Sequence, residues 1–309
     1  MTTENAQPPK VGIILPVAEW RMDGETPRWS DLLVMSRRAE ELGFDSIWVV
    51  DHLLVVSDDE PTAGVWEGWS LLSALAAATE RVELGSLVAC MGFRNPALLA
   101  KMAETVDEIS DGRLVLGLGA GHHEPEYRAF GFPFDHRVSR FEEAIQIIHG
   151  LLRDGSVDFA GHYHQARDCV LRPRGPRPGG IPIMIGTTGP RMLRLTAHYA
   201  DTWNVYFDKT DNSVDGLRPL IDTVDAACAD AGRDPATLER TASILVGLEG
   251  RTEVQGPAVT PFSGSIDDLA NEIRTYAGLG ISHVQIRVEP NTLASIDRLA
   301  PVLERVRDG

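Results

Sequence analysis

The sequence predicts an α/β fold: a (β/α)8 barrel of the triosephosphate isomerase (TIM) type that spans residues 1–309 as one domain. Eight apolar, strand-type runs alternate with amphipathic helical patterns along the chain. The length of 309 residues suits such a barrel, which needs about 250 residues. Polar and glycine-rich stretches follow several of the predicted strands directly, as they do at the active-site end of a barrel. An open doubly wound sheet is the alternative that the same alternation allows.

The first four β/α units follow one another without interruption. The predicted strands are 10–17, 45–50, 81–88 and 113–119, and the predicted helices are 30–43, 69–80, 95–110 and 141–152. In the first helix, Leu32, Met35 and Ala39 recur at helical spacing. The third helix opens with Asn95 as a capping residue and Pro96 at the first helical position. Periodicity and end signals therefore agree on the same boundaries.

The alternation is interrupted once, after the fourth helix. Residues 155–181 predict a β-hairpin insertion that is closed by a Pro/Gly-rich connector. The last four units then predict strands 181–186, 201–205, 239–248 and 282–288, with helices at 190–200, within 214–231, at 265–280 and from 293 onward. Ser265 and Asp268 form a capping-box pattern at the start of the seventh helix. The segments 17–30 and 249–263 are predicted to be barrel loops.

Charge and cysteine content exclude several classes of function. The chain has 29 Lys and Arg against 45 Asp and Glu, a formal net charge of −16, which repels nucleic acids and anionic lipids. We therefore expect a small-molecule substrate and no nucleic-acid or membrane partner. No signal-peptide pattern and no run of about 18 apolar residues occurs, which predicts a cytoplasmic protein. The three cysteines (Cys90, Cys169 and Cys228) form no CxxC pair, so neither disulfides nor a zinc site are expected.

The end of the second predicted strand places Asp51 and His52 at the barrel mouth. An imidazole at a strand end can pass protons near neutral pH, and a neighbouring carboxylate can orient it. Because adjacent strand residues point to opposite faces, we expect only one of the two to enter the mouth. Both are predicted to be catalytic residues. In the alternative interpretation Asp51 caps the loop and His52 packs against it.

Glycines and histidines follow the fourth predicted strand. Gly119, Ala120 and Gly121 leave room for a ligand to approach the strand end, and we predict that they bind a cofactor. His122 and Glu124 come directly after them and are predicted to be catalytic residues. The fourth strand therefore contributes both kinds of residue to the predicted site.

Two histidine pairs raise the question of a metal. His122 and His123 beside Glu124, and His162 with His164 in the predicted hairpin, carry ligand-type side chains. Most short histidine pairs are incidental, however, and no HExxH pattern lies on a predicted helix. We therefore predict no metal site.

The fifth predicted strand is joined directly to a helix by Thr187, Thr188 and Gly189. Backbone N–H groups at a helix start form a natural cradle for a phosphate, so these residues are predicted to bind a cofactor. The alternative is a tight turn in which threonine and glycine serve the backbone conformation alone. Cys90 follows the third strand at the same end of the barrel and is included in the cofactor-binding set.

Together, these segments resemble a known family. They are "FDSIWVVDHL", "NPALLAKMAETVDEISDGRLVLGLGAG", "EPEYRAFG" and "IPIMIGTTGPRMLRLTAHYADTWN". They are similar to the bacterial luciferase-like monooxygenase superfamily, and most closely to its branch that uses the deazaflavin coenzyme F420. The resemblance covers nearly the whole chain in the family order. It implies an (α/β)8 barrel with a flavin or deazaflavin in its mouth.

The resemblance also implies roles for individual residues. It places His52, next to Asp51, at the reacting carbon of the ring, where it assists proton movement. It implies a non-prolyl cis peptide between Leu87 and Val88, which forms a bulge behind the ring. By the same resemblance, the segment 119–121 runs along the cofactor, and the turn at 187–189 holds the cofactor phosphate.

The chain departs from the family pattern at one position. Sugar-phosphate dehydrogenases of the family carry a glutamate acid where this chain has His122. We therefore expect a less charged substrate, with Glu124 and Glu126 as the remaining candidates for an acid.

These observations predict an F420-dependent oxidoreductase that transfers hydride between the deazaflavin and a small organic substrate, such as a ketone or alcohol, an imine or an activated C=C bond. An FMN-dependent monooxygenase is the first alternative. A metal-dependent barrel hydrolase that uses Asp51, His52, His122 and His283 is the second, and a protein that binds the cofactor without turnover is the third. By analogy with the family we expect a homodimer.

Overall fold

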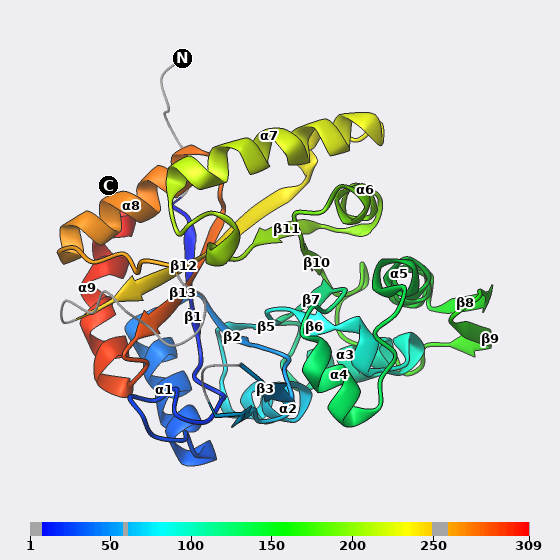
Figure 1. The fold of residues 1–309 in the computed structure, drawn as a ribbon, viewed down its shortest axis with the longest axis horizontal. Coiled ribbons are helices and arrows are strands. Elements are labelled where there is room, and N and C mark those ends of the chain that lie inside the picture. The colour runs from blue at the N-terminus through cyan, green and yellow to red at the C-terminus, as the bar shows by residue number, and fades with distance from the viewer. Residues whose placement is uncertain (1–7, 58–60, 249–258, 309) are drawn as a thin grey trace.

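The computed structural model describes residues 8–57, 61–248 and 259–308 (Figure 1). Within these ranges eight parallel strands form a barrel: β1 (Lys10–Ile14), β2 (Ser46–Val49), β5 (Glu83–Ser86), β7 (Leu114–Gly119), β10 (Ile183–Gly186), β11 (Thr202–Val205), β12 (Glu239–Gly247) and β13 (His283–Glu289). Each strand pairs with the next one in this order, and β13 pairs with β1. The sheet is therefore closed. The predicted barrel is confirmed, and the open doubly wound alternative is wrong.

Helices surround the barrel (Figure 1). They are α1 (Trp29–Leu42), α2 (Gly68–Ala78), α3 (Pro96–Ile109), α5 (Arg137–Asp154), α6 (Pro190–Tyr199), α7 (Val214–Asp230), α8 (Ile266–Gly278) and α9 (Leu293–Asp308). The main difference from prediction is a short helix, α4 (Glu124–Phe130), between β7 and α5. Its seven residues are too few for helical periodicity to stand out. The next helix begins at Arg137, before the predicted start at 141. Its N-cap His136 makes no capping side-chain bond, so no capping residue marked this start in the sequence.

Two antiparallel hairpins are added to the barrel. The predicted insertion after the fourth barrel helix is confirmed as β8 (Ser156–Ala160) and β9 (Gln165–Val170), which project from the side of α5 (Figure 1). A second hairpin, β3 (Leu54–Val55) with β4 (Ala63–Gly64), was not predicted and lies between β2 and α2. The predicted loop 249–263 falls mostly on residues 249–258, which lie outside the described residues. Across the described ranges, no helix combines the length and apolarity needed to cross a membrane.

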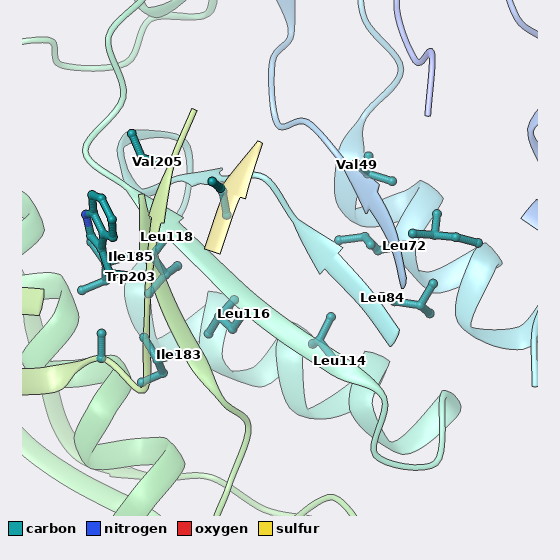
Figure 2. Close-up of a cluster of buried hydrophobic side chains, with 14 of the residues drawn as sticks. Val49, Leu72, Leu84, Leu114, Leu116, Leu118, Ile183, Ile185, Trp203 and Val205 are labelled. Atoms are coloured by element: carbon teal, nitrogen blue, oxygen red, sulfur yellow. The ribbon is translucent and has the colours of Figure 1, made fainter. Parts of the chain in front are cut away.

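The layer between barrel and helices forms the main hydrophobic core. Leu114, Leu116 and Leu118 alternate along β7 and are completely buried. Successive strand side chains point to opposite faces, so these three leucines face the helices and the residues between them face the barrel interior. Figure 2 shows them with side chains of neighbouring strands and with Leu72 of α2. This alternation separates the outer core from the barrel interior.

Trp48 fills part of the barrel interior. Its side chain is 1% exposed. A Cβ atom on Gly85 of β5 would lie 2.1 Å from the Trp48 ring, and one on Gly12 of β1 would lie 2.8 Å from its Nε1. The indole therefore occupies the space that Gly85 leaves open, and it shares the space beside Gly12 with the Ser46 hydroxyl, which lies 2.0 Å from that Cβ position.

His283 lies at the opposite end of the barrel from the carboxyl ends of the strands. It is the first residue of β13, and its Nε2 lies 2.7 Å from Ser46 Oγ. Burial, with a smaller contribution from the positive charge of Lys10, lowers the pKa of His283 to about 3. This histidine is therefore far along the strand from the mouth. The ligand set of the hydrolase alternative, which combined it with Asp51 and His52, is not assembled.

We expect His283 to make the protein less stable in acid. Its pKa in the folded state lies below the unfolded value of 6.5. The unfolded chain therefore binds more protons below pH 6.5, and stability decreases by about 1.4 kcal/mol for each pH unit below that value. Urea unfolding at pH 7 and pH 5 should show this loss in the wild type and a smaller loss in His283→Asn. The exposed His162 supplies the control, since His162→Asn should keep the wild-type slope. Equal slopes in wild type and His283→Asn would contradict the assignment.

Candidate active site

The carboxyl ends of the barrel strands surround a cavity of about 580 Å³, a size common for small-molecule and cofactor sites. Most of the predicted site residues line it: Asp51, His52, Leu87, Val88, Cys90, Gly119, Ala120, Gly121, His122, Thr187, Thr188 and Gly189. Glu124 does not. It is the first residue of α4, and its side chain is exposed to solvent. Residues from four strand ends therefore meet as the barrel geometry predicts.

His52 is held by a carboxylate from a distant part of the chain. Its Nδ1 lies 2.9 Å from Oε1 of Glu126, which α4 carries over the mouth. Burial raises the pKa of Glu126, but hydrogen bonds from His52 and from the backbone N–H groups of Leu53 and Leu54 outweigh it, so the pKa lies below the usual value. The carboxylate that orients His52 is therefore that of Glu126. The sequence analysis gave this part to the adjacent Asp51.

Two more histidines stand beside His52. The ring centroids of His122 and His123 lie 5.4 and 6.2 Å from that of His52. Burial, followed by the neighbouring histidines, lowers the pKa of His122, although its ring is open to the cavity. His123 Nε2 accepts a hydrogen bond from Val56 N–H at 3.0 Å. Among the residues that the structure describes, no group of three or more His, Cys, Asp and Glu side chains is arranged to hold a metal ion.

Asp51 lines the cavity as His52 does, against the expectation that only one of the two enters the mouth, and its carboxylate forms a buried ion pair. Its carboxylate accepts hydrogen bonds from Arg94 Nη1 at 2.6 Å and Nη2 at 2.9 Å. It also accepts one from Cys90 N–H at 2.8 Å. The side chains of Asp51 and Arg94 are only 2% and 11% exposed. Asp51 therefore anchors the turn that follows β5, including β6 (Ala89–Cys90), against the end of β2.

Cys90 and Gly121 meet at Tyr127 of α4. The Tyr127 hydroxyl donates to Ala120 O at 3.2 Å and lies 2.8 Å from Cys90 Sγ. Burial raises the pKa of Cys90 to about 12, so the thiol stays protonated. Gly121 has a φ of +76°, and a Cβ there would lie 2.0 Å from the Tyr127 hydroxyl oxygen. Conformation and space both require glycine at this position.

The peptide bond between Leu87 and Val88 is cis, as the resemblance implies. The Val88 side chain enters the space between two neighbouring strand ends. A Cβ on Gly119 of β7 would lie 2.6 Å from Val88 Cγ2, and one on Gly186 of β10 would lie 3.0 Å from Val88 Cγ1. The glycine of β7, which we related to the approach of a ligand, thus also makes room for Val88 beside the cavity.

The turn between β10 and α6 lines the cavity with Thr187, Thr188 and Gly189. Thr187 Oγ1 accepts from Gly189 N–H at 3.2 Å, and Thr187 O accepts from Trp203 Nε1 at 2.7 Å. Gly189 is the N-cap of α6, and a Cβ there would meet nothing within 4 Å. Over the described parts of the chain, the N–H of Thr188 has no hydrogen-bond acceptor. The start of α6 thus has a backbone N–H group that an anion could contact.

Several residues that line the cavity were missed by the sequence analysis. Tyr206 and Lys209 follow β11, and Arg287 lies near the end of β13. The strand-end rule would have found them had it been applied to the sixth and eighth strands. Arg287 Nη2 lies 2.8 Å from Glu289 Oε1, and Lys209 Nζ lies 2.9 Å from Asp208 Oδ2. Both cations therefore have carboxylate partners.

The lining fits a planar heterocycle that carries a phosphate. The side chains of Ile14, Leu87 and Val88 supply apolar wall. Asn291, which is 4% exposed, donates through Nδ2 to Ile14 O at 2.9 Å. Its buried Oδ1 has no hydrogen-bond partner within the described residues. The open N–H of Thr188 is available to the phosphate.

Comparison with known proteins places the chain in a family. The sequence profile described as luciferase-like monooxygenase matches residues 10–254. An F420-dependent glucose-6-phosphate dehydrogenase of Intrasporangium calvum is 32% identical, and the alignment covers 86% of this chain and 91% of the relative. A pyrimidine monooxygenase, RutA, of Methylobacterium radiotolerans is 32% identical over 72% of this chain and 61% of the relative.

A solved structure has the same fold. It is an F420-dependent secondary alcohol dehydrogenase in complex with an F420–acetone adduct. It is 21% identical in sequence, with a TM-score of 0.77 over 98% of this chain and 100% of that one. At this identity the likeness concerns the fold alone, and it agrees with the closed barrel described above. On the match of its sequence, the chain belongs to the luciferase-like monooxygenase family of oxidoreductases.

Proposed function

We propose that the protein is a coenzyme F420-dependent oxidoreductase. It transfers hydride between the deazaflavin and a small organic substrate, namely a ketone or alcohol, an imine or an activated C=C bond. The observation that carries the proposal is His52, which lines the cavity and is fixed by the buried Glu126. A histidine held in this way suits a reaction in which a proton accompanies a hydride. The similarity to an F420-dependent dehydrogenase over most of the chain supports the same cofactor.

The residues around the cavity have separate roles in the proposed reaction. The bound deazaflavin supplies the hydride chemistry. The turn of Thr187, Thr188 and Gly189 binds its phosphate through backbone N–H groups at the start of α6. Val88, which lines the cavity at the cis peptide, would support the cofactor ring, and His52 would hold or release the proton at its own ring nitrogen. The apolar wall excludes water from the reacting atoms.

An FMN-dependent monooxygenase is the second candidate. The observation in its favour is the similarity to a pyrimidine monooxygenase, which matches that of the dehydrogenase in identity. The same anion site and apolar wall would accept either cofactor.

Titration of the apo-protein separates the two candidates. With F420 and with FMN, followed by cofactor fluorescence, we expect saturable binding of both and tighter binding of F420. Tight FMN binding without F420 binding would overturn the proposed cofactor. Thr188→Glu places a negative charge beside the proposed phosphate site, so it should weaken F420 binding while circular dichroism stays that of the wild type. Unchanged affinity in the folded variant would place the phosphate elsewhere.

A further inference from the structure

Glu126 uses both oxygens of its carboxylate at the cavity wall. Oε1 contacts His52 Nδ1 at 2.9 Å. Oε2 accepts from Leu53 N–H at 2.8 Å and from Leu54 N–H at 3.4 Å. The carboxylate is 2% exposed, so these three groups take the place of water around it. One side chain therefore fixes both the imidazole and the backbone that follows it.

Among the groups around the His52–Glu126 pair, Glu126 is the carboxylate that contacts the His52 ring. His122 and His123 contact the His52 ring edge to face, and Tyr127 and Cys90 feel the charge of Glu126. Asp51, the adjacent carboxylate, is engaged by Arg94 and Cys90. The other charged side chains around the cavity are Arg21, Asp208, Lys209, Arg287 and Glu289.

We infer that Glu126 is the positioning residue for His52: it holds the ring so that Nδ1 carries the hydrogen and Nε2 is left to face the bound substrate. The inference rests on the proposed function for its catalytic meaning, but the geometry stands without it. An ionised carboxylate only accepts hydrogen bonds, so the atom that faces it across 2.9 Å must be a donor. Neutral His52 is therefore the Nδ1–H tautomer, with a lone pair on Nε2.

The lone pair on His52 Nε2 can accept the proton that the substrate releases. When an alcohol is oxidised, the hydride leaves its carbon for the oxidised deazaflavin and the O–H bond breaks. The proton passes to His52 Nε2 while the C=O bond forms, and reduction of a ketone reverses each step. Glu126 keeps its charge throughout and stabilises the imidazolium.

Glu126→Gln tests the inference with little change of shape. The amide oxygen of the substituted side chain can still accept from Leu53 and Leu54, which leaves its NH₂ group to donate to His52 Nδ1. The hydrogen of neutral His52 should then move to Nε2, the nitrogen that must be free. Long-range ¹H–¹⁵N NMR of histidine-labelled protein reports the tautomer directly, and the signal missing in His52→Asn identifies His52. We expect Nδ1–H in the wild type and Nε2–H in Glu126→Gln. An Nε2–H tautomer in the wild type would overturn the inference.

Turnover supplies the second readout. Glu126→Gln should lower kcat by roughly 10²–10⁴-fold, with little change in cofactor affinity, because the tautomer is wrong for proton transfer. In a His52→Asn background the same substitution should change kcat by less than about twofold, since the two residues act as one unit. A loss of equal size in both backgrounds would mean that Glu126 acts only on the loop backbone. Glu108→Gln is the matched control, since Glu108 is an exposed glutamate of α3 outside the cavity lining, and this variant should resemble the wild type.

The two proposals fail in different ways. If no F420-dependent turnover is found but the wild type shows the Nδ1–H tautomer, the positioning role stands and the proposed function falls. If turnover is found and the tautomer is Nε2–H, the function stands and the positioning role falls.

Discussion

His52→Asn is expected to lower turnover by roughly 10²–10⁴-fold while cofactor binding stays nearly unchanged. Asparagine keeps a polar group of similar shape beside Glu126, but it cannot relay a proton near neutral pH. The His52 ring lines the cavity and does not belong to the barrel core, so the fold should lose little stability. Cofactor affinity, melting temperature and turnover should be measured on the same preparation.

A second histidine supplies the control for His52→Asn. His162→Asn changes an exposed histidine of the β8–β9 hairpin and should leave all three quantities unchanged. If the turnover per folded molecule survives in His52→Asn, then His52 is structural. The proton must in that case pass through His122, which also lines the cavity, or through solvent.

Arg94→Ala is expected to reduce the free energy of unfolding by about 3–5 kcal/mol. The substitution leaves the Asp51 carboxylate buried with only the Cys90 N–H as a partner, and an uncompensated buried charge is strongly destabilising. Urea unfolding at pH 7 measures the loss.

Two further variants test whether the buried charge of Asp51 causes the loss of stability in Arg94→Ala. In an Asp51→Asn background Arg94→Ala should cost less, because the carboxylate that then loses its counterion is that of Glu67, which is 41% exposed and open to water. Arg38→Ala removes an exposed ion pair with Asp297 and should leave the unfolding midpoint almost unchanged. If Arg94→Ala were as mild as Arg38→Ala, the buried pair would contribute nothing.

Strong, regular patterns made most of the fold predictable from sequence. The strand β7 shows why, since Leu114, Leu116 and Leu118 give a buried parallel strand a near-continuous apolar run. The hairpin β3–β4 lacks such a run because each strand has only two residues. The helix α4 was not predicted for a similar reason, because its seven residues are too few for a periodic signal. The length of an element, more than its residue types, therefore decided whether the sequence could predict it.

For the site, the rule that active sites lie at strand ends found the cavity, but it did not find the contacts. Asp51 and His52 are neighbours in the sequence, yet their partners Arg94 and Glu126 lie 43 and 74 residues further along the chain. Which carboxylate reaches an imidazole depends on how α4 returns over the mouth, and no local pattern encodes that return. The sequence therefore indicated the location of the site better than the pairing within it.

The arrangement of Val88 between Gly119 and Gly186 also constrains how this sequence can diverge. A methyl group on Gly119 would overlap Val88 Cγ2, whereas a smaller side chain at position 88 would leave space for it. Changes at these three positions are therefore coupled, and their order matters: Val88 must shrink before Gly119 can grow. Among relatives of this chain, the sizes of the three residues should covary so that their combined volume stays nearly constant.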